Sequence, residues 1–467
     1  MALCSRLPCE VAWPPVAGYV EPAKCSLKGL QHPHKRLPPV SVAKLRKFLL
    51  RVYGFFTAAG ARLHIGIDDL HYAALKEELR RTFSDRFVSA EGNGLVGTVS
   101  PNSVEELRDL VDVAARHAVP LLARGAGTSP HVPLAVAGLQ VSLRGLQRLL
   151  ALDPAAGVAA IEPGMTWGAL IRELQPQGWM PRVYPSSRAV STVGGFVAQG
   201  GVGVGSFEFG SIRQSVARVR LLTPQGELLE VAGDDLGSVV GGEGRTGLIV
   251  EVDLLLQAWA PMEPLIAAFN SVEDVERCLA DLWRQPLPVW SIGLMDQAAV
   301  SLQVSQGAPV EALPKGRCAA LFSFRCQDRK SVLPQLRGSI LGAGGRVSAI
   351  RGTHDQWIDR FMGLQALATT PVPLQFSLGL GKLRPMLRAL RPELRRRLGF
   401  EAVVANTALP MAVRFFLLEP PRDLAENVDV AHELLSIARS LGGQSLPSQV
   451  LSAGSDYRTP RREASTE

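Results

Sequence analysis

The sequence of 467 residues predicts an α+β protein that is long enough for two or three folded domains. Between Val99 and Leu174, the predicted order is a helix, a strand and then antiparallel-type strands, which differs from a regular βαβ succession. In residues 259–445, predicted strands alternate with helices in a pattern typical of an antiparallel sheet covered on one face.

The composition describes an ordinary soluble globular chain, with 46% hydrophobic and 20% charged residues. No apolar run approaches 18 residues, so we expect no transmembrane segment. The net charge of +7 is concentrated in residues 1–64, which hold ten Lys or Arg and two acidic residues. The rest of the chain is nearly neutral, which argues against nucleic acid as a partner.

Cysteine usage predicts a reducing compartment, and we expect a cytoplasmic location. The six cysteines are scattered and form no CxxC pair. We therefore interpret them as packing or surface residues rather than as ligands of a zinc or iron–sulfur site.

The N-terminal 64 residues form a basic extension that contains a predicted amphipathic helix over 41–56. Its apolar side chains share one face, and Lys44, Lys47 and Arg51 lie on the other. Such a helix can dock peripherally on an anionic membrane surface. It can equally pack on the body of the protein, or belong to a start codon assigned too early.

Capping signals define the elements up to Leu174. Ser103 is a candidate N-cap with Glu106 three residues later, and its helix is expected to end near His117. A buried strand over 120–123 should follow, and Thr166 can cap a helix that begins at Trp167. Two short strands are expected between these elements, at 138–143 and 157–162, with a turn at Asp153-Pro154 before the second.

The loop Arg124-Gly125-Ala126-Gly127-Thr128-Ser129 is the first candidate ligand site. Its two glycines allow a tight turn in which successive N–H groups converge on anionic oxygens. Arg124 adds a forked cation, and Thr128 and Ser129 add hydroxyl donors. Alone, the same pattern also fits an ordinary turn.

A second glycine-rich stretch runs from Tyr184 to Gly205 and contains six glycines. Side chains this small allow a ligand to lie directly against the main chain. The alternative is a flexible linker, but Val193, Phe196 and Val197 are too apolar for one. A hairpin with its turn at 224–226 and a third glycine loop, Gly241–Gly247, precede an apolar strand over 248–256.

The second half of the chain is predicted to contain three strands and four helices. Ser271 is a candidate cap for the first of these helices. The strands are 319–326, 346–350 and 412–418, and the helices are 272–284, 328–341, 354–367 and 424–441.

Four linked motifs resemble the FAD-binding domain of the vanillyl-alcohol oxidase and p-cresol methylhydroxylase superfamily, in its glycolate oxidase and D-lactate dehydrogenase branch. They are 124–128, 185–195, Phe209-Gly210 and 240–249. The resemblance implies a PCMH-type FAD-binding domain of two α+β subdomains at 65–258 and a C-terminal α+β cap domain with an antiparallel sheet at 259–445. Residues 446–467 would be a polar tail.

The resemblance also implies which residues bind FAD. The first loop would wrap the pyrophosphate, the second stretch would line the flavin and ribityl chain, and the last motif would reach the adenine side. Some family members attach FAD to a histidine at the position of Thr128, so we expect non-covalent FAD here. The implied cofactor-binding residues are Arg124, Gly125, Ala126, Gly127, Thr128, Ser129, Pro185, Ser186, Ser187, Thr192, Gly194, Gly195, Gly201, Gly247 and Ile249.

The sequence departs from the branch where a histidine-rich stretch precedes a late cap strand. Asn406–Met411 occupies that place without an imidazole or a carboxylate, so we expect no metal. The late Glu-His-Gly element is also replaced, by Gly442-Gly443-Gln444-Ser445.

Three residues are catalytic candidates. Arg360 lies in a Trp357-x-x-Arg360 element that resembles one in the branch, and Lys382 lies in a glycine-bounded turn. His354 is a candidate base, because an imidazole can accept a proton near neutral pH. A solvated helix arginine and a capping or surface histidine are the alternatives. Glu243 is interpreted as a structural carboxylate, and the basic run from Arg391 to Arg397 as a solvated helix face.

Two functions are consistent with these motifs. The first is an FAD-dependent oxidoreductase that removes a hydride from a small hydroxy acid or alcohol. The second is a non-autonomous FAD-binding electron-transfer subunit, whose cap would dock an iron–sulfur or other electron-acceptor protein.

Overall fold

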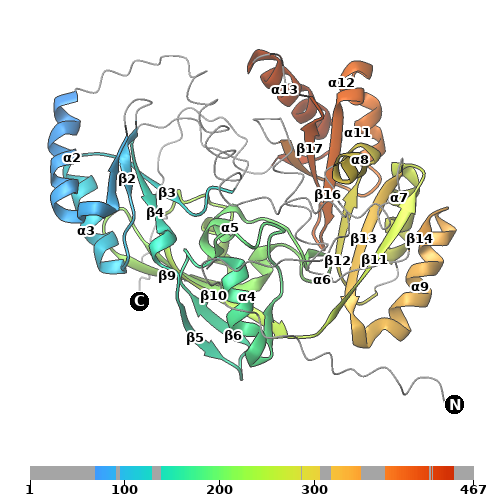
Figure 1. Cartoon of the computed structure of the whole chain (residues 1–467), viewed down its shortest axis with the longest axis horizontal. Coiled ribbons are helices and arrows are strands. Elements are labelled where there is room, and N and C mark those ends of the chain that lie inside the picture. The colour runs from blue at the N-terminus through green and yellow to red at the C-terminus, as the bar shows by residue number, and fades with distance from the viewer. Residues whose placement is uncertain are drawn as a thin grey trace, which may run out of the picture. The chain divides into compact units, whose positions relative to one another are not determined.

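The computed structural model describes residues 69–90, 95–128, 138–284, 287–305, 317–348, 374–419, 422 and 424–445. The chain divides into Met1–Lys47 and Phe48–Glu467, and every described residue belongs to the second unit. The predicted helix over 41–56 lies outside the described residues, as do Ser129, His354 and Arg360. The described strands form three sheets (Figure 1).

The first sheet has the order β1-β2-β4-β3 and packs against two helices through a shared apolar core. As predicted, Ser103 caps α3, because its Oγ accepts the Glu106 N–H at 3.2 Å. The Glu106 carboxylate bonds to the N–H of Asn102 at 2.8 Å rather than to that of Ser103. The elements are α2 (Asp69–Phe83), β1 (Phe87–Ser89), β2 (Leu95–Val99), α3 (Val104–Arg116), β3 (Leu121–Arg124) and β4 (Gly138–Ser142).

Two predictions for this sheet are wrong. β4 pairs in parallel with both β2 and β3, so β2, α3 and β3 form a βαβ crossover that the sequence pattern did not reveal. β3 is not a buried strand, since its residues are half-buried or exposed. It lies at the edge of the sheet, where only one neighbour covers it.

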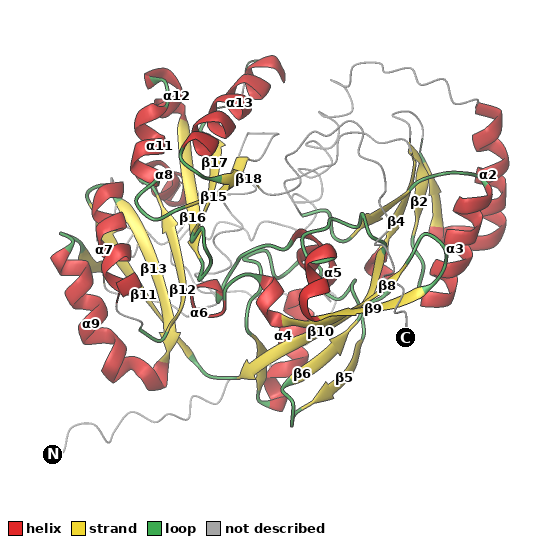
Figure 2. Ribbon diagram, turned by 180° about the vertical axis from the view of Figure 1, so that it is seen from behind, coloured by secondary structure: helices red, strands yellow, loops and turns green. Residues whose placement is uncertain are grey.

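The second sheet is antiparallel and has the order β5-β6-β10-β8-β9, with β7 paired to β10. The predicted hairpin at 224–226 and the Thr166 cap of α4 are confirmed. Its apolar face packs on α4 and α5 (Figure 2). The elements are β5 (Leu149–Asp153), β6 (Val158–Ile161), α4 (Trp167–Leu174), β7 (Trp179–Pro181), α5 (Val193–Gln199), α6 (Ser206–Phe209), β8 (Val216–Leu222), β9 (Leu228–Ala232) and β10 (Leu248–Ala258).

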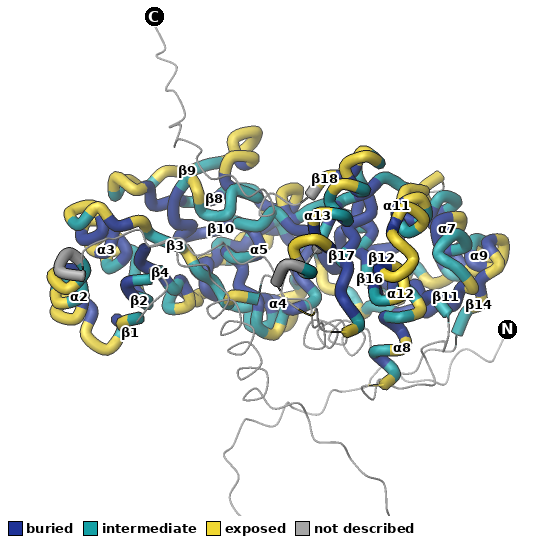
Figure 3. The backbone as a smooth tube through the Cα atoms, turned by 90° about the horizontal axis from the view of Figure 1, so that it is seen from above, coloured by how far each residue is buried: buried dark blue, intermediate teal, exposed yellow. Residues whose placement is uncertain are grey.

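The third sheet, called the cap sheet below, is antiparallel throughout and has the order β14-β11-β13-β12-β16-β17-β15-β18. Its strands β12 and β17 are dark blue, and thus buried, along most of their length in Figure 3. The strands are β11 (Met262–Phe269), β12 (Val289–Met295), β13 (Cys318–Arg325), β14 (Arg346–Ser348), β15 (Leu374–Leu378), β16 (Leu398–Val404), β17 (Met411–Leu417) and β18 (Gln444–Ser445).

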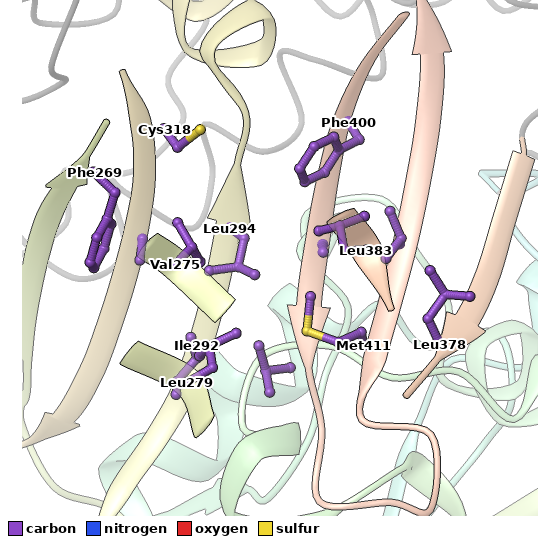
Figure 4. Packing of buried hydrophobic residues seen from close by; sticks show 14 of the residues in the cluster. Phe269, Val275, Leu279, Ile292, Leu294, Cys318, Leu378, Leu383, Phe400 and Met411 are labelled. Carbon is purple, nitrogen blue, oxygen red and sulfur yellow. The ribbon is translucent and has the colours of Figure 1, made fainter. Parts of the chain in front are cut away.

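One face of the cap sheet, called the helix face below, packs against α7, α9, α11 and α13 in the largest apolar core of the described residues (Figure 4). The predicted helix over 272–284 matches α7, and Ser271 caps it by accepting the Asp274 N–H at 3.2 Å. The helices are α7 (Val272–Arg284), α8 (Gln297–Ser305), α9 (Arg329–Gly342), α11 (Leu383–Ala389), α12 (Pro392–Arg397) and α13 (Leu424–Ser440).

The expectation that only one face of this sheet is covered is wrong. The other face, called the second face below, packs against α8 through Met295, Val300 and Phe416 in a smaller apolar cluster. α8 escaped prediction because its apolar residues show no helical periodicity.

Candidate functional site

The first glycine loop lies against the N-terminal end of α5. A Cβ added at Gly125 would meet Thr192 Oγ1 at 2.3 Å and Gly195 Cα at 3.5 Å. Thr192 caps α5, and its Oγ1 accepts the Gly195 N–H at 3.3 Å. Gly125 and Thr192, which are 67 positions apart in the sequence, are therefore in direct contact, with no space for a side chain between them.

The third glycine loop meets the other end of α5. The N–H groups of Gly241 and Glu243 donate to the carbonyls of Val197 and Ala198 at 3.3 and 2.9 Å. Gly200 has φ +62°, and a Cβ there would lie 2.9 Å from Gly241 Cα. The first and third glycine-rich segments thus meet the two ends of one short helix, α5, which belongs to the second segment.

The Arg124 guanidinium lies at the first loop. Its Nη1 donates to Gln140 Oε1 of β4 at 3.2 Å. Its guanidinium also lies over the loop, since a Cβ on Gly127 would approach Nη2 at 2.7 Å. Gly127 has φ +66°, which favours glycine and lets the chain turn back under the guanidinium.

A main-chain bridge places Pro185–Ser187 beside the glycines at 201–205. The amide of each of Tyr184 and Val204 bonds to the carbonyl of the other, at 3.1 and 2.8 Å. A Cβ on Gly203 would lie 2.3 Å from the Tyr184 carbonyl oxygen, so only glycine fits here. The side chain of Ile249, which the motif also included, belongs to the apolar core.

These residues fit a dinucleotide cofactor. A diphosphate carries two negative charges and needs converging N–H groups and a cation. The first loop carries the Arg124 cation, and the glycines at 125 and 195 let its main chain pack directly against the start of α5. FAD would therefore be bound by main chain and by Arg124.

The cap sheet contacts this region through α6, which follows the glycines at 201–205. The Asn406 N–H, in the loop between β16 and β17, donates to the Ser206 carbonyl at 2.9 Å. Trp290 of β12 is fully buried and donates from Nε1 to the Arg182 carbonyl at 3.0 Å. Arg325 of β13 donates to Glu208 Oε1 at 3.0 Å.

An ion pair that sequence analysis missed lies on the second face of the cap sheet. Arg414 of β17 and Glu401 of β16 are direct cross-strand partners, with Nη1 and Oε1 3.0 Å apart. Burial raises the pKa of the Glu401 carboxyl, although Arg414 opposes that shift. The sequence did hold a signal for this pair. Apolar residues alternate along both strands, and Glu401 and Arg414 are the charged residues at the positions that face away from the apolar core.

The structure places the remaining predicted residues away from this ion pair. Lys382 is exposed and directly precedes α11 of the helix face, which gives no support to a catalytic role. Arg391 and Arg397 of the basic run are paired with Glu433 and Glu426.

Among the residues that the structure describes, no three His, Cys, Asp or Glu side chains form a metal-binding group. Within the same ranges, no helix is long and apolar enough to span a membrane.

Comparisons with known proteins agree with this geometry. Residues 96–232 match the FAD binding domain family model. The chain is 27% identical over 229 residues to glycolate oxidase subunit GlcD of Escherichia coli strain K12, covering 46% of each chain. It is 24% identical over 230 residues to the mitochondrial D-lactate dehydrogenase [cytochrome] of Arabidopsis thaliana, covering 46% of this chain and 40% of that protein. The chain thus spans about half the length of these relatives.

Solved structures show the same fold at low sequence identity. An alkyldihydroxyacetonephosphate synthase superposes with a TM-score of 0.67 at 16% identity, over 86% of each chain. p-Cresol methylhydroxylase superposes with a TM-score of 0.65 at 14% identity, over 81% of this chain and 89% of the other. The α+β fold predicted from the motifs is confirmed. Residues 96–232 carry an FAD binding domain, and the chain is similar to these FAD-linked relatives over about half of its length.

Proposed function

We propose that this protein is an FAD-dependent oxidoreductase that removes a hydride from a small hydroxy acid or alcohol. The observation that carries the proposal is that the first and third glycine-rich segments meet the two ends of α5, beside the Arg124 guanidinium. FAD supplies the two-electron acceptor when bound. The homologous oxidases and dehydrogenases support this reaction class.

We propose that different residues of the chain bind different parts of FAD. Residues 124–129 hold the diphosphate, while 185–187, 192–195 and Gly201 line the flavin, and 247–249 lie on the adenine side. We also propose the division into an FAD-binding domain at 65–258 and a cap domain at 259–445. The contacts of Ser206 and Glu208 with the cap sheet support the cap's role in closing the substrate site.

Absorbance spectroscopy of the purified protein tests this proposal. We expect a yellow protein that releases FAD on heating or acidification, because Thr128 offers no imidazole for a covalent link. Anaerobic mixing with a panel of hydroxy acids and alcohols should bleach the flavin. If dithionite bleaches it and no panel member does, the protein is not an autonomous dehydrogenase.

The second candidate is an FAD-binding electron-transfer subunit. Two observations favour it: the relative in Escherichia coli is named as a subunit, and Asn406–Met411 carries no imidazole or carboxylate. Co-purification from a native source distinguishes the two functions. An iron–sulfur partner that is required for turnover supports the subunit, whereas turnover by the isolated chain with an artificial acceptor supports the autonomous enzyme.

A further inference from the structure

We propose that Arg325 of the cap sheet is a positioning residue for FAD, and that it acts through Glu208 and α6 on the glycines at 201–205. This inference rests on the proposed function, specifically on the role of Gly201 in lining the flavin. It predicts that the affinity for FAD and the environment of the flavin depend on a side chain of the cap.

α6 joins the glycines at 201–205 to the cap sheet. It directly follows Gly205 and lies next to β12 (Figure 1). Ser206, its first residue, is fully buried, and Ser206 Oγ accepts the Gly203 N–H at 2.9 Å. The Ser206 N–H donates in return to the Gly203 carbonyl at 3.2 Å. A displacement of α6 would therefore displace Gly203 as well.

The main chain around Gly205 is too closely packed to absorb such a displacement. Gly205 has φ +89°, and a Cβ added there would lie 2.0 Å from the Arg182 carbonyl oxygen. The same Cβ would lie 2.5 Å from Trp290 Nε1. Closely packed interiors transmit a shift rather than absorb it. The glycines at 201–205 should therefore follow α6.

The cap contacts α6 at both of its ends. At the start, the Ser206 carbonyl accepts the Asn406 N–H at 2.9 Å. Near the end, Glu208 Oε1 accepts a hydrogen bond from Arg325 Nη2 of β13 at 3.0 Å. The first contact is a main-chain hydrogen bond, whereas the second depends on the Arg325 side chain. Substitution of Arg325 should therefore release one end of α6 and leave the other end bonded.

A second partner holds the Arg325 guanidinium in one orientation. Nη2 also donates to Gln257 Oε1 of β10 at 2.6 Å, and the Arg325 side chain is 14% exposed. Gln257 Nε2 in turn donates to the Pro181 carbonyl at 3.4 Å. Hydrogen bonds that involve ionised groups are stronger than those between neutral groups. Arg325 thus ties α6 to the end of β10, the strand that follows the third glycine loop.

FAD binding by the full chain tests the proposal without requiring turnover. FAD is removed by acid, and the dissociation constant for its return is measured from the quenching of flavin fluorescence. Arg325→Gln should weaken FAD binding about tenfold or more, because it removes a charge-assisted hydrogen bond to α6. Arg325→Lys should recover part of the affinity, since an ammonium group still donates to Glu208. FAD affinity in Arg325→Gln within about twofold of wild type would overturn the proposal.

A double variant tests whether Arg325 acts through Glu208. Glu208→Gln alone should also weaken FAD binding, because it removes the negative charge that pairs with Arg325. Arg325→Gln combined with Glu208→Gln should bind FAD as Arg325→Gln alone does, within about twofold. Fully additive losses of affinity would show that the two residues act independently and would contradict the proposal.

A control variant separates positioning from a general loss of stability. Arg397→Gln removes another partly buried ion pair, the one with Glu426, whose two residues both belong to the cap. Its FAD affinity should equal that of wild type. The visible circular dichroism of the bound flavin, recorded at saturating FAD, should change in Arg325→Gln and stay unchanged in Arg397→Gln. Equal losses of FAD affinity in the two variants would assign the effect to stability and overturn the proposal.

Two milder variants decide the question if Arg325→Gln does not fold. Arg325→Lys and Glu208→Gln keep hydrogen-bonding groups at the joint, and both should weaken FAD binding and alter the flavin spectrum. Wild-type affinity and a wild-type spectrum in both variants would overturn the proposal.

The two proposals fail differently. If FAD affinity depends on Arg325 and no panel member reduces the flavin, the oxidoreductase proposal fails and the positioning role stands. If panel members reduce the flavin and FAD affinity is independent of Arg325, the positioning role is wrong and the oxidoreductase proposal stands.

Discussion

Single residues decide how closely the segments of the FAD site approach one another. At Gly125, an added Cβ would lie 2.3 Å from Thr192 Oγ1, well inside van der Waals contact. Thr192 caps α5, so a side chain at 125 would displace both the first loop and the cap. The requirement for glycine here comes from tertiary contact rather than from backbone conformation, since the φ angle of Gly125 is not positive.

We predict that Gly125→Ala strongly reduces FAD content, because the loop must shift by more than an ångström to relieve the contact. The ratio of flavin absorbance to protein absorbance after purification measures the effect. Gly338→Ala is the matched control: it lies inside α9 with no neighbour within 4 Å of the added Cβ. Alanine there should stabilise the helix by about 0.5–1 kcal/mol. Normal FAD content in Gly125→Ala would contradict the packing described for this loop.

At the scale of secondary structure, the sequence predicted best the elements with local signals. Ser103, Thr166 and Ser271 each cap the helix expected of them, because a cap is a contact within four residues. β11, β12 and β16 were missed, since central strands buried on both sides show little polar alternation. The parallel pairing of β3 with β4 joins strands separated by a long loop. Local sequence patterns therefore do not predict the direction of this pairing.

The same limit applies to the candidate site. Glycine-rich segments identified the FAD region because their composition is unusual over a short stretch. Arg414 and Glu401 are ordinary residues in the sequence, and only the register of β16 and β17 makes them partners. Lys382 was suggested by its flanking glycines, and these serve the turn that starts α11.

The N-terminal end of α8 is predicted to make stability depend on pH. Asp296 Oδ1 accepts the Ala299 N–H at 2.7 Å, and burial raises the pKa of the Asp296 carboxyl to about 7. The unfolded chain ionises this group near pH 4. Between these values the folded state binds more protons, so the free energy of unfolding falls as the pH rises from about 4 to 7, by up to about 4 kcal/mol.

Asp296→Asn should reduce the pH dependence of the free energy of unfolding, because asparagine does not titrate. The asparagine side chain still offers an oxygen that can cap α8. Urea unfolding at pH 5 and pH 8 measures the pH dependence, and the gap between the two midpoints should be smaller in the variant than in wild type. Asp153→Asn, at the exposed end of β5, is the control and should keep the wild-type gap. An unchanged gap in Asp296→Asn would show that other groups carry the pH dependence.

At the scale of the whole molecule, Trp290 joins the cap sheet to the FAD-binding part of the chain. Its ring is fully buried and lies 5.7 Å from that of Tyr184, next to Pro185 of the second glycine-rich stretch. Its Nε1 donates to the Arg182 carbonyl. Heat should therefore unfold the two parts in one transition.

We predict that Trp290→Phe lowers the free energy of unfolding by about 1–3 kcal/mol, because it removes a buried hydrogen bond and leaves a small cavity. Flavin release, followed by its fluorescence, and helix loss, followed by circular dichroism, should shift together to lower temperature. Trp259→Phe is the control, since Trp259 is 39% exposed and should change stability by less than about 0.5 kcal/mol. Separate shifts of the two signals would indicate that the cap unfolds independently.

The position of β10 has a consequence for how the protein acquires its cofactor during synthesis. β10 lies between β6 and β8 in the second sheet, yet it is the last strand of that sheet to be translated. The Gly241–Gly247 loop directly precedes it. A nascent chain that has left the ribosome only as far as β9 therefore has a sheet with a missing centre and cannot yet close around FAD. Cofactor capture must wait until about residue 258 has emerged, by which time β11 of the cap is already following.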